Sequence, residues 1–574
     1  MAVTRAQKMA FSVNRAKFAG RGLCAVSRFF ADELHRGTLL KNLKGMAKGA
    51  IEDMSWAALL EEKAARIPDK KFILFKDEVF TYRQMDENAN RAANFLLSLG
   101  GGRGKGIGMF MRNSPRFLDI FFGAQKIGMY VVPINSELKG DGLAYILDHS
   151  DVEMLAIDAE LLDVFEKIPQ KPERLKTVIV DDIEEESHGF AIPETALPLS
   201  GFRAFPPNNP GVGYNPEDMI LLIYTSGTTG RPKGVVYTYN RSRVKLLGLM
   251  GGLLVKPNDV YYTALALCHG NALFLTVTLS MAQGATVVLS RKFSASRFWD
   301  DINSYNVTLF NTIGSLVPIL MKQPVRPNEK THKVRCVLSA ACPADMWEAF
   351  EKRFNVTIYE GYGAVDSGGK GILNLGTAPV GSLGKPLGPP GSARVIDENG
   401  NDVPPDTPGQ LIFKVGDKKS SVRYYKNDEA TEKKVHGGFM YTGDIVRKDS
   451  DGYLYFVGRD TESMRKGGEN VSAYEVEHVI VSHPDIEDAA VYAVPSELAE
   501  DEIMASIKMM PGKTIDPAEL RSWLNDKLAR YAIPRYIRFV DEFPMTQTHR
   551  IIKKELETAG VTKDTYDSQA AKRT

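Results

Sequence analysis

A loop of hydroxyls, glycines and cations follows an apolar run near the middle of the chain. The run Met219–Tyr224 has the length and composition of a buried strand. Glycines let backbone N–H groups approach a ligand closely, hydroxyls donate hydrogen bonds, and a lysine adds positive charge. The sequence therefore predicts a polyphosphate site, distinct from a Walker A loop, which requires G-x-x-x-x-G-K-[ST]. Its predicted residues are Thr225, Ser226, Gly227, Thr228, Thr229, Gly230 and Lys233.

This loop and several later motifs resemble those of the adenylate-forming superfamily, which contains acyl-CoA synthetases, luciferases and peptide-synthetase adenylation domains. The motifs follow the superfamily's order over residues 50–556. The resemblance implies that a carboxylate attacks the α-phosphate of ATP, pyrophosphate leaves, and a thiol then displaces AMP. Cations and hydrogen-bond donors should converge on the phosphorus transition state. The implied cofactors are ATP, Mg²⁺ and coenzyme A.

An adenine site is predicted downstream. The stretch Glu360–Asp366 resembles the Y-G-x-T-E motif, which implies that adenine stacks on Tyr362 and that Asp366 holds magnesium with a catalytic role. Asp366 is one methylene shorter than the superfamily's Glu but keeps the oxygen ligand that magnesium prefers. Val365 lacks the hydroxyl of the superfamily's Thr. The other residues predicted here are Ala340, Ala341, Gly361 and Gly363 for the nucleotide and Thr228 for the metal.

An acidic residue further on is predicted to bind the ribose. Tyr441–Asp444 matches the T-G-D motif, which implies that Asp444 accepts hydrogen bonds from both ribose hydroxyls. One carboxylate has two oxygens and can bind a cis-diol. Gly458–Asp460 matches the next motif, which implies a second ribose contact from Arg459 and a hinge at Asp460.

Two further segments resemble parts that handle the thiol and the acyl group. Arg465–Ser472 resembles the R-x-K-G-E-N-V-S stretch that lines the pantetheine tunnel of thioester-forming members. Leu267–Gly270 resembles the segment whose His or aromatic residue gates the acyl pocket, which implies a catalytic role for His269. The predicted coenzyme A contacts are Lys466, Gly467 and Gly468, and the predicted acyl-pocket residues are His269, Asn311, Gly314 and Ser315.

The clearest departure from the superfamily lies near the C-terminus. Pro544–Lys554 aligns with P-x-T-x-x-G-K-x-x-[RK], whose lysine bridges the substrate carboxylate and the α-phosphate. Arg550 stands at the position of that lysine, and His549 replaces the glycine. Arginine keeps the charge but is bulkier and planar. We therefore predict Lys233, Arg550 and Lys553 as catalytic cations, with adenylation that is slow or shifted in geometry.

The resemblance leaves the substrate open. Arg291–Asp301 closely resembles a stretch of the fatty-acid transport protein and very-long-chain acyl-CoA synthetase branch, and the crotonobetaine/carnitine–CoA ligase branch carries a looser version. We therefore predict an acid–thiol ligase that acts on a fatty acid. The alternatives are a ligase for crotonobetaine, carnitine or another small acid, a catalytically weakened protein that binds nucleotide or fatty acid, and an enzyme that charges a carrier protein.

Composition limits the class of protein. A chain of 574 residues is too long for one compact core. The net charge of +1 gives no general attraction to nucleic acid. Four scattered cysteines fit a reducing compartment, so we expect a cytoplasmic protein. No apolar run is long enough to cross a bilayer. A homodimer remains open.

The first 50 residues carry ten Lys and Arg but only Asp32 and Glu33 as acids, with apolar residues among them. Three interpretations of this leader stay open. It is a solvated or loosely docked segment, a basic amphipathic anchor that holds the protein peripherally on an anionic membrane, or a mitochondrial presequence.

The pattern of elements predicts an α/β fold. Short apolar strands alternate with helical segments such as residues 85–99, which favours mostly parallel sheets covered by helices. The glycine run Gly100–Gly106 is interpreted as a turn because its spacing does not give G-x-G-x-x-G. The predicted order is a leader (1–50), a large N-terminal domain (51–459) with a β-rich subdomain from about 375, a small mobile α+β lid domain (460–558) and a frayed polar tail (559–574).

Overall fold

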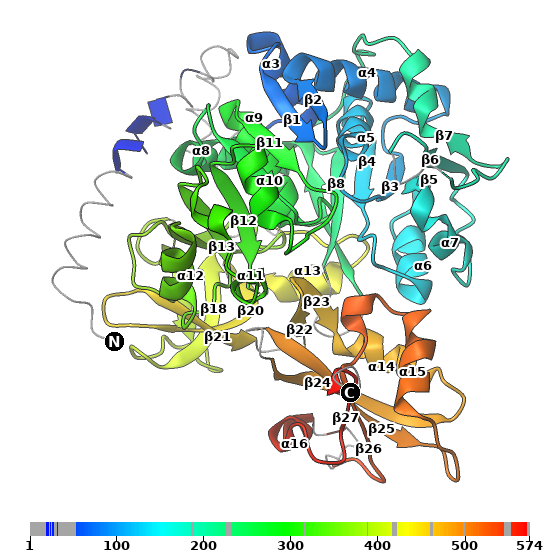
Figure 1. Cartoon of the computed structure of the whole chain (residues 1–574), viewed down its shortest axis with the longest axis vertical. Coiled ribbons are helices and arrows are strands. Elements are labelled where there is room, and N and C mark those ends of the chain that lie inside the picture. Colours follow the sequence, from blue (N-terminus) through cyan, green and yellow to red (C-terminus); the bar gives the residue numbers. More distant parts are fainter. Residues whose placement is uncertain are drawn as a thin grey trace.

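The computed structural model describes residues 53–184, 189–225, 231–314, 316–386, 388–415, 422–459, 463–496, 500–544, 551 and 553–570, and a few positions between 19 and 31. The predicted leader, the loop Ser226–Gly230, Ser315, the hinge Asp460 and Arg550 therefore lie outside the described residues, apart from those few leader positions. Figure 1 shows a large α/β body with a smaller C-terminal domain below it.

One large sheet of the body has the order β7–β6–β5–β3–β4–β8–β9. It is parallel except for the last pair, in which β8 and β9 run antiparallel with Thr225 opposite Lys233. The predicted phosphate loop is therefore the connection at the end of this pair. The strands are β3 (Gly106–Phe110), β4 (Tyr130–Pro133), β5 (Val152–Asp158), β6 (Thr177–Asp181), β7 (Leu197–Pro198), β8 (Met219–Thr225) and β9 (Lys233–Thr238).

A second large sheet has the order β16–β15–β14–β13–β12–β10–β11–β1–β2 and is parallel from β14 to β1. Its strands β11 and β12 are fully buried, as expected where both faces of a parallel sheet are covered. The strands are β1 (Lys71–Phe75), β2 (Glu78–Thr81), β10 (Val260–Thr263), β11 (Thr286–Leu289), β12 (Leu309–Ile313), β13 (Cys336–Ala340), β14 (Ile358–Gly363), β15 (Gly371–Asn374) and β16 (Lys385–Pro386).

Helices cover and connect these sheets (Figure 1). The predicted helix over 85–99 corresponds to α4, which begins with a capping box between Thr81 and Gln84 and ends at Ser98, one residue earlier than predicted. The helices are α3 (Trp56–Arg66), α4 (Tyr82–Ser98), α5 (Pro115–Lys126), α6 (Gly140–His149), α7 (Leu162–Glu166), α8 (Val244–Leu254), α9 (Leu279–Gln283), α10 (Phe298–Ser304), α11 (Leu316–Met321) and α12 (Trp347–Phe354). Shorter turns are η1 (Ala159–Leu161), η3 (Leu199–Ala204), η4 (Tyr239–Arg241), η6 (Pro327–Lys330) and the π-helical η5 (Asn271–Thr278).

A β-rich subdomain completes the large body. Its sheet has the order β17–β18–β20–β19, and β21 pairs with β20. The elements are β17 (Ala393–Ile396), β18 (Pro408–Lys414), α13 (Asp428–Lys434), β19 (Val435–His436), β20 (Phe439–Lys448) and β21 (Leu454–Arg459).

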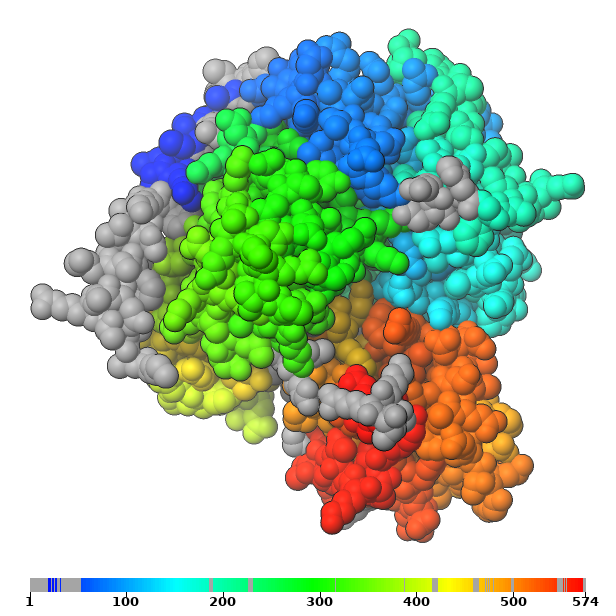
Figure 2. Space-filling model, in the orientation of Figure 1, coloured from blue at the N-terminus to red at the C-terminus, as the bar shows by residue number. Residues whose placement is uncertain are grey.

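The C-terminal lid domain has its own hydrophobic core and forms a separate lobe, coloured orange to red in Figure 2. Helix α15 has Asp516 as its N-cap, and the Asp516 side chain accepts from the N–H groups of Ala518 and Glu519. The elements are β22 (Ser463–Lys466), β23 (Glu469–Ser472), α14 (Ala473–Val481), β24 (Ile486–Pro495), β25 (Asp501–Met509), α15 (Pro517–Asn525), η7 (Arg530–Ala532), β26 (Tyr536–Phe539), α16 (Lys553–Ala559) and β27 (Tyr566–Asp567).

The α/β fold class with a smaller C-terminal domain is confirmed, but one prediction about the end of the chain is wrong. Within the predicted tail (559–574), the described residues up to Ala570 are not frayed, because β27 pairs with β26 and Arg535 forms two hydrogen bonds to Asp567 at 2.9 and 3.0 Å. Among the residues that the structure describes, no helix combines the length and apolar composition that a bilayer crossing requires.

Candidate active site

A cavity of about 1050 Å³ is lined by residues from the body, the β-rich subdomain and the lid domain. Lys233 and Asp444, which come from β9 and β20 and are 211 residues apart, both line it. The predicted phosphate and ribose residues therefore lie at one site. A cavity of this size, with polar groups at one part and apolar side chains at another, has room for a nucleotide beside a second substrate.

Positive side chains gather on the predicted phosphate side of the cavity. Lys233, Lys433 and Lys434 all line it, and the Lys233 ammonium lies 5.6 Å from the centre of the Tyr424 ring. Burial lowers the pKa of Lys233, and the charges of Lys433 and Lys434 lower it further. Thr225 lines the same side. This concentration of like charge favours an anionic ligand such as a polyphosphate.

The carboxylate of Asp366, the predicted magnesium ligand, is already bonded to other side chains. Asp366 Oδ2 accepts a hydrogen bond from the Tyr424 hydroxyl at 2.6 Å and lies 2.9 Å from the Lys434 ammonium. Among the described residues, no group of three or more His, Cys, Asp or Glu side chains is arranged to hold a metal. These residues do not fit a resident metal ion. A magnesium ion here would arrive as part of the MgATP substrate.

Tyr362 and Asp444 meet at the predicted adenine and ribose positions. The Tyr362 hydroxyl donates a hydrogen bond to Asp444 Oδ2. The Asp444 N–H in turn donates to Thr442 Oγ1 at 3.0 Å, which fixes the backbone of the T-G-D motif. Ala340, Gly361 and Gly363 also line the cavity. Arg459 lies opposite Asp444 in the pairing of β20 with β21, and its side chain is outside the described set.

A buried carboxylate supports this nucleotide side. Glu360 is 2% exposed and accepts hydrogen bonds from the N–H groups of Ala341 at 2.5 Å and Cys342 at 3.2 Å. Ala341 has φ +66°, a conformation that is costly for a residue with a Cβ. Burial raises the pKa of Glu360 to about 7, although the two N–H groups oppose this. Glu360 therefore holds the strained segment beside Ala340.

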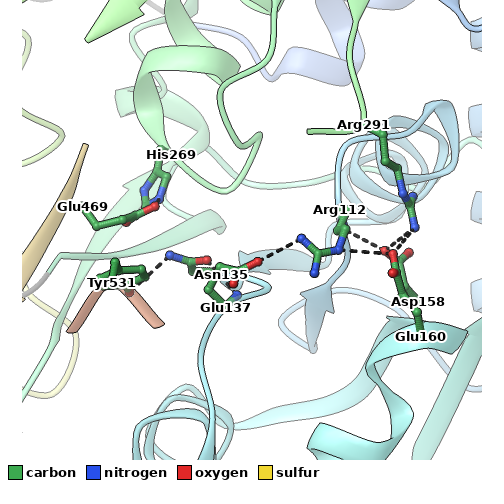
Figure 3. A network of polar contacts seen from close by, with 9 residues as sticks. All are labelled: Arg112, Asn135, Glu137, Asp158, Glu160, His269, Arg291, Glu469 and Tyr531. Carbon is green, nitrogen blue, oxygen red and sulfur yellow. Dashed lines mark hydrogen bonds and ion pairs between the residues drawn. The ribbon is translucent and has the colours of Figure 1, made fainter. Parts of the chain in front are cut away.

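The lid domain reaches the site through its first hairpin. Glu469 Oε1 lies 2.8 Å from His269 Nε2, so the two domains are joined at the predicted gate (Figure 3). Burial opposes charge on the imidazole, but Cys268 and Glu469 outweigh it and raise the pKa of His269 well above its ordinary value. The predicted thiol-binding residues Gly467 and Gly468 line the cavity.

Gly468 lies close against the body. It has φ +80°, and a Cβ added there would lie 2.0 Å from Ile313 Cδ1. Lys466, which was also predicted to contact coenzyme A, instead pairs with Glu502 within the lid domain at 2.7 Å and is not among the cavity-lining residues. The hairpin therefore lines the cavity with Arg465, the two glycines and Glu469, and not with Lys466.

A second polar contact joins the domains beside the gate. The Asn135 side-chain amide donates to the Tyr531 hydroxyl at 3.3 Å, and both residues line the cavity. Figure 3 shows that the neighbouring Glu137 continues this contact into a network of arginines and acids in the body. The ion pairs of that network are Arg112–Glu137 at 2.9 Å, Arg112–Glu160 at 3.2 Å, Arg291–Asp158 at 2.8 Å and Arg291–Glu160 at 2.8 Å.

The predicted acyl-pocket residues divide between the cavity and its surroundings. His269 lines the cavity. Asn311 is 4% exposed and donates at 2.7 Å to Asn271, which does line it, so Asn311 supports the wall from behind. Gly314 packs against Ala341. The apolar wall consists mainly of Leu247, Met250, Leu254, Phe274, Leu275, Ile313, Leu316, Ile319, Leu338, Ile372 and Leu373.

The structure does not bring Lys553 to the cavity. Its ammonium lies 2.7 Å from Glu477 Oε1 inside the lid domain, and Glu477 also accepts from the Val491 N–H at 2.6 Å. Because Lys553 already has this acidic partner, the structure assigns it a structural contact.

Sequence reasoning missed several residues that shape the site. Lys434 and Tyr424 hold Asp366, and Glu360 holds the segment beside the predicted adenine position. Only Glu360 carried a signal, because it begins the stretch Glu360–Asp366 that resembles the Y-G-x-T-E motif. The others depend on contacts between elements far apart in the chain.

Comparison with known proteins agrees with this arrangement. The family model described as AMP-binding enzyme matches residues 60–417, and the AMP-binding enzyme C-terminal domain matches residues 475–550. The crotonobetaine/carnitine–CoA ligase of Salmonella paratyphi B is 30% identical over 511 residues, which cover 85% of this chain and 96% of that protein.

Solved structures share the fold. A double mutant of o-succinylbenzoate CoA synthetase from Bacillus subtilis has a TM-score of 0.72 at 21% identity and covers 87% of this chain and 97% of its own. The fatty acyl CoA synthetase of Mycobacterium tuberculosis has a TM-score of 0.60 at 24% identity and covers 88% and 97%. The family match over most of the body and the identity across 85% of the chain show that this protein belongs to the AMP-binding enzyme family of acid–CoA ligases.

Proposed function

We propose that this protein is an ATP-dependent acid–CoA ligase that forms an acyl-adenylate and then a thioester. The observation that carries the proposal is that Lys233, Asp444 and the hairpin glycine Gly468 line one cavity together with an apolar wall. A nucleotide, an acid and a thiol are the three reactants that such a lining suits. Related proteins that are named as CoA ligases support the same reaction.

Different residues act in the two steps of the proposed reaction. Lys233 and Lys434 offset the negative charge of the triphosphate while the carboxylate attacks, and Asp444 holds the ribose. AMP then serves as the leaving group. The thiol approaches along the lid hairpin at Gly468, where the absence of a Cβ leaves room for its arm. His269 lies at the meeting point of the cavity and the hairpin and controls access between the acyl and thiol sides.

The class of acid favoured by the relatives differs from the class that the sequence analysis predicted. The relatives at 30% identity carry crotonobetaine and carnitine in their names, whereas the fatty acyl CoA synthetase is a structural neighbour at 24% identity. These findings favour the small-acid alternative over the fatty-acid reading. The apolar wall of leucines, isoleucines and Phe274 is the observation that keeps a fatty acid as the second candidate.

The test follows both half-reactions with a panel of acids. ATP–pyrophosphate exchange reports adenylation, and formation of CoA thioester reports the second step. Lys233→Met should reduce both by roughly 100-fold, as expected when a charge contact in the transition state is lost. Lys385→Met is the matched control, since Lys385 pairs with a backbone carbonyl on the outside of the body. Absence of exchange and of thioester with every acid, in protein that binds ATP, would leave the weakened nucleotide-binding homologue as the function.

Three further expectations remain predictions. Acyl transfer to holo-carrier protein but not to free coenzyme A would select the carrier-charging alternative. Binding of the full chain to anionic vesicles, with loss of binding in a chain that lacks residues 1–50, would support a peripheral anchor. A homodimer would appear as twice the chain mass in solution.

A further inference from the structure

Arg243 occupies a fixed position at the start of α8. Its backbone is left-handed, with φ +66° and ψ +11°, and its N–H donates to Asp53 Oδ2 at 2.6 Å. The other oxygen of Asp53 accepts from the N–H groups of Lys245 and Met54 at 3.0 Å each. Asp53 is thus committed to backbone groups, and it anchors the residue from which the Arg243 side chain extends.

The Arg243 guanidinium has no bonded partner in the described part of the chain. It forms no hydrogen bond or ion pair there, whereas Arg335 lies 2.6 Å from Asp259 and Arg353 lies 3.0 Å from Glu329. The hydroxyl of the neighbouring Tyr237 donates to the Val365 carbonyl at 2.6 Å. Burial lowers the pKa of Arg243, and Asp53 and Tyr237 offset this only in part. An unpaired and partly desolvated cation is expensive to maintain without a purpose.

This cation belongs to the apolar part of the cavity. Arg243 lines the cavity next to the first turn of α8, which supplies Leu247 to the wall. Its side chain packs against Gly369, where an added Cβ would lie 3.5 Å from Arg243 Cδ. The next residue, Lys370, also lines the cavity and adds a second positive charge to this part of the wall.

The acids that line the cavity do not neutralise Arg243. Asp366 is paired with Lys434, Asp444 accepts from Tyr362, and Glu469 is bonded to His269. Glu475 belongs to the lid domain and lies beside Gly142. Among the described residues, no acid that lines the cavity therefore pairs with Arg243, and Asp53, whose oxygens accept from backbone N–H groups, offsets its charge only from a distance.

We propose that Arg243 binds a second anionic group of the acid substrate, at a position remote from the carboxylate that is activated. The substrates are accordingly acids with an apolar body and a distal carboxylate, that is, dicarboxylic acids. A planar guanidinium pairs with a carboxylate through two parallel hydrogen bonds. The inference rests on the proposed function and names the class of acid for the same site.

The same charge selects against two other classes of acid. A plain fatty acid would place a methyl group against the guanidinium and leave it unpaired. A betaine would place a quaternary ammonium near Arg243 and Lys370, so that like charges repel. Sites that are built to bond a polar group reject analogues without it by large factors, because their own buried group is left without a partner.

The experiment compares matched acids in wild type and in variants of the full chain. CoA thioester formation is measured as kcat/KM for monocarboxylic and α,ω-dicarboxylic acids of equal carbon number, and for carnitine as the betaine. We expect wild type to prefer the dicarboxylic acid by at least about 100-fold. Arg243→Met should remove most of that preference by lowering the rate with the dicarboxylic acid, while the rate with the monocarboxylic acid is kept or improved.

Two further variants make the result specific. Arg243→Lys keeps the charge without the planar fork and should lose less of the preference than Arg243→Met. Arg241→Met is the matched control, because Arg241 lies two residues away, pairs with Glu217 at 3.7 Å and does not line the large cavity. It should keep the wild-type preference.

The outcomes separate this inference from the proposed function. No pyrophosphate exchange and no thioester with any acid would overturn the proposed function. Turnover of monocarboxylic acids with rejection of dicarboxylic acids would leave the ligase intact and overturn the inference. An equal ratio in wild type and Arg243→Met would also overturn it. If Arg243→Met does not fold, the wild-type ratio and Arg243→Lys decide between these results.

Discussion

The ammonium of Lys434 lies 2.9 Å from Asp366 Oδ2, at the position where the sequence pattern predicts a magnesium ligand. Both side chains are about 85% shielded from solvent. The carboxylate is therefore neutralised by a protein cation that comes from the end of α13. This pairing changes what each residue is expected to do for the nucleotide.

Replacing Lys434 and replacing Asp366 should have opposite effects on ATP binding. Lys434→Gln leaves the Asp366 charge facing the triphosphate, so we expect the KM for ATP to rise roughly tenfold, equivalent to a loss of about 1.4 kcal/mol. Asp366→Asn leaves Lys434 free to attract phosphate, so the KM should stay the same or fall. Pyrophosphate exchange measures both. Lys426→Gln is the control, because Lys426 also pairs with an aspartate, Asp151 at 2.7 Å, but neither residue lines the cavity. Loss of exchange in Asp366→Asn that excess Mg²⁺ restores would instead make Asp366 a metal ligand.

Glu360 should determine ATP affinity through the segment that it holds. Glu360→Gln replaces one acceptor with an N–H₂ group that cannot accept from Cys342 or Ala341. We expect the KM for ATP to rise roughly tenfold, within the cost of a lost buried hydrogen bond. Glu351→Gln is the control, because Glu351 also accepts a backbone N–H, from Ile358 at 2.7 Å, but neither Ile358 nor its two chain neighbours line the cavity, whereas Glu360 holds the segment next to the lining residue Ala340. Equal KM values for both variants would contradict the assigned role.

The pair of Arg291 and Asp158 should give a pH-dependent contribution to stability. Burial raises the pKa of Asp158 to about 7, although Arg291 opposes this, and the ordinary value is 3.8. As the pH rises, Asp158 loses its proton in the unfolded chain before it does so in the folded chain. The free energy of unfolding therefore falls between about pH 4 and about pH 7 and then levels off. Without Arg291 the pKa of Asp158 in the folded protein rises further, so the free energy of unfolding continues to fall above pH 7.

Arg291→Leu should therefore cost about 3 kcal/mol in unfolding free energy at pH 8, with a smaller cost at pH 5, where Asp158 is protonated in the folded state. Urea unfolding at several pH values measures this. Arg83→Leu breaks the exposed pair with Asp69 and should cost less than about 1 kcal/mol at every pH. A cost for Arg291→Leu that does not change with pH would show that the Asp158 charge is not its cause.

The contact between His269 and Glu469 should matter more for thioester formation than for adenylation, because it joins the lid hairpin to the body. Glu469→Gln should slow thioester formation while pyrophosphate exchange changes less. Since the pKa of His269 is raised, the charged pair exists at neutral pH and is lost as the pH rises through that pKa. Wild type should then approach the variant at alkaline pH. Glu487→Gln, which breaks a lid pair with Lys508 away from the hairpin, is the control. An equal loss in both half-reactions would argue against a role in lid docking.

Local pattern predicted the fold well where burial is continuous. The run Met219–Tyr224 matches β8 to within one residue, because a strand covered on both faces is apolar throughout. The boundary between α12 and β14 depends on backbone conformation instead, since Asn355 ends α12 with φ +53° and β14 begins only at Ile358. The ordered end of the chain depends on the pairing of Asp567 with Arg535, which no local pattern reveals.

The same limit applies to the site. Lys233, Tyr362 and Asp444 were predicted because each lies within a short motif, and they line one cavity. Lys434 and Arg243 were missed, because their importance comes from what lies near them in space. Asp366 shows both cases, since the motif identified the residue and only the fold revealed its partner.

The close approach of Gly468 to Ile313 links the size of the acid to the position of the lid domain. Ile313 belongs to the apolar wall of the cavity, where we propose that the acid binds, and the lid backbone lies directly against it. An acid that displaces Ile313 outward must push the hairpin away, and a hairpin pressed inward must narrow the space for the acid. Coupling between two sites is reciprocal, so an acid of a length that the closed lid disfavours will itself favour the open lid. The preference for chain length and the equilibrium between lid positions are therefore set by one coupling free energy.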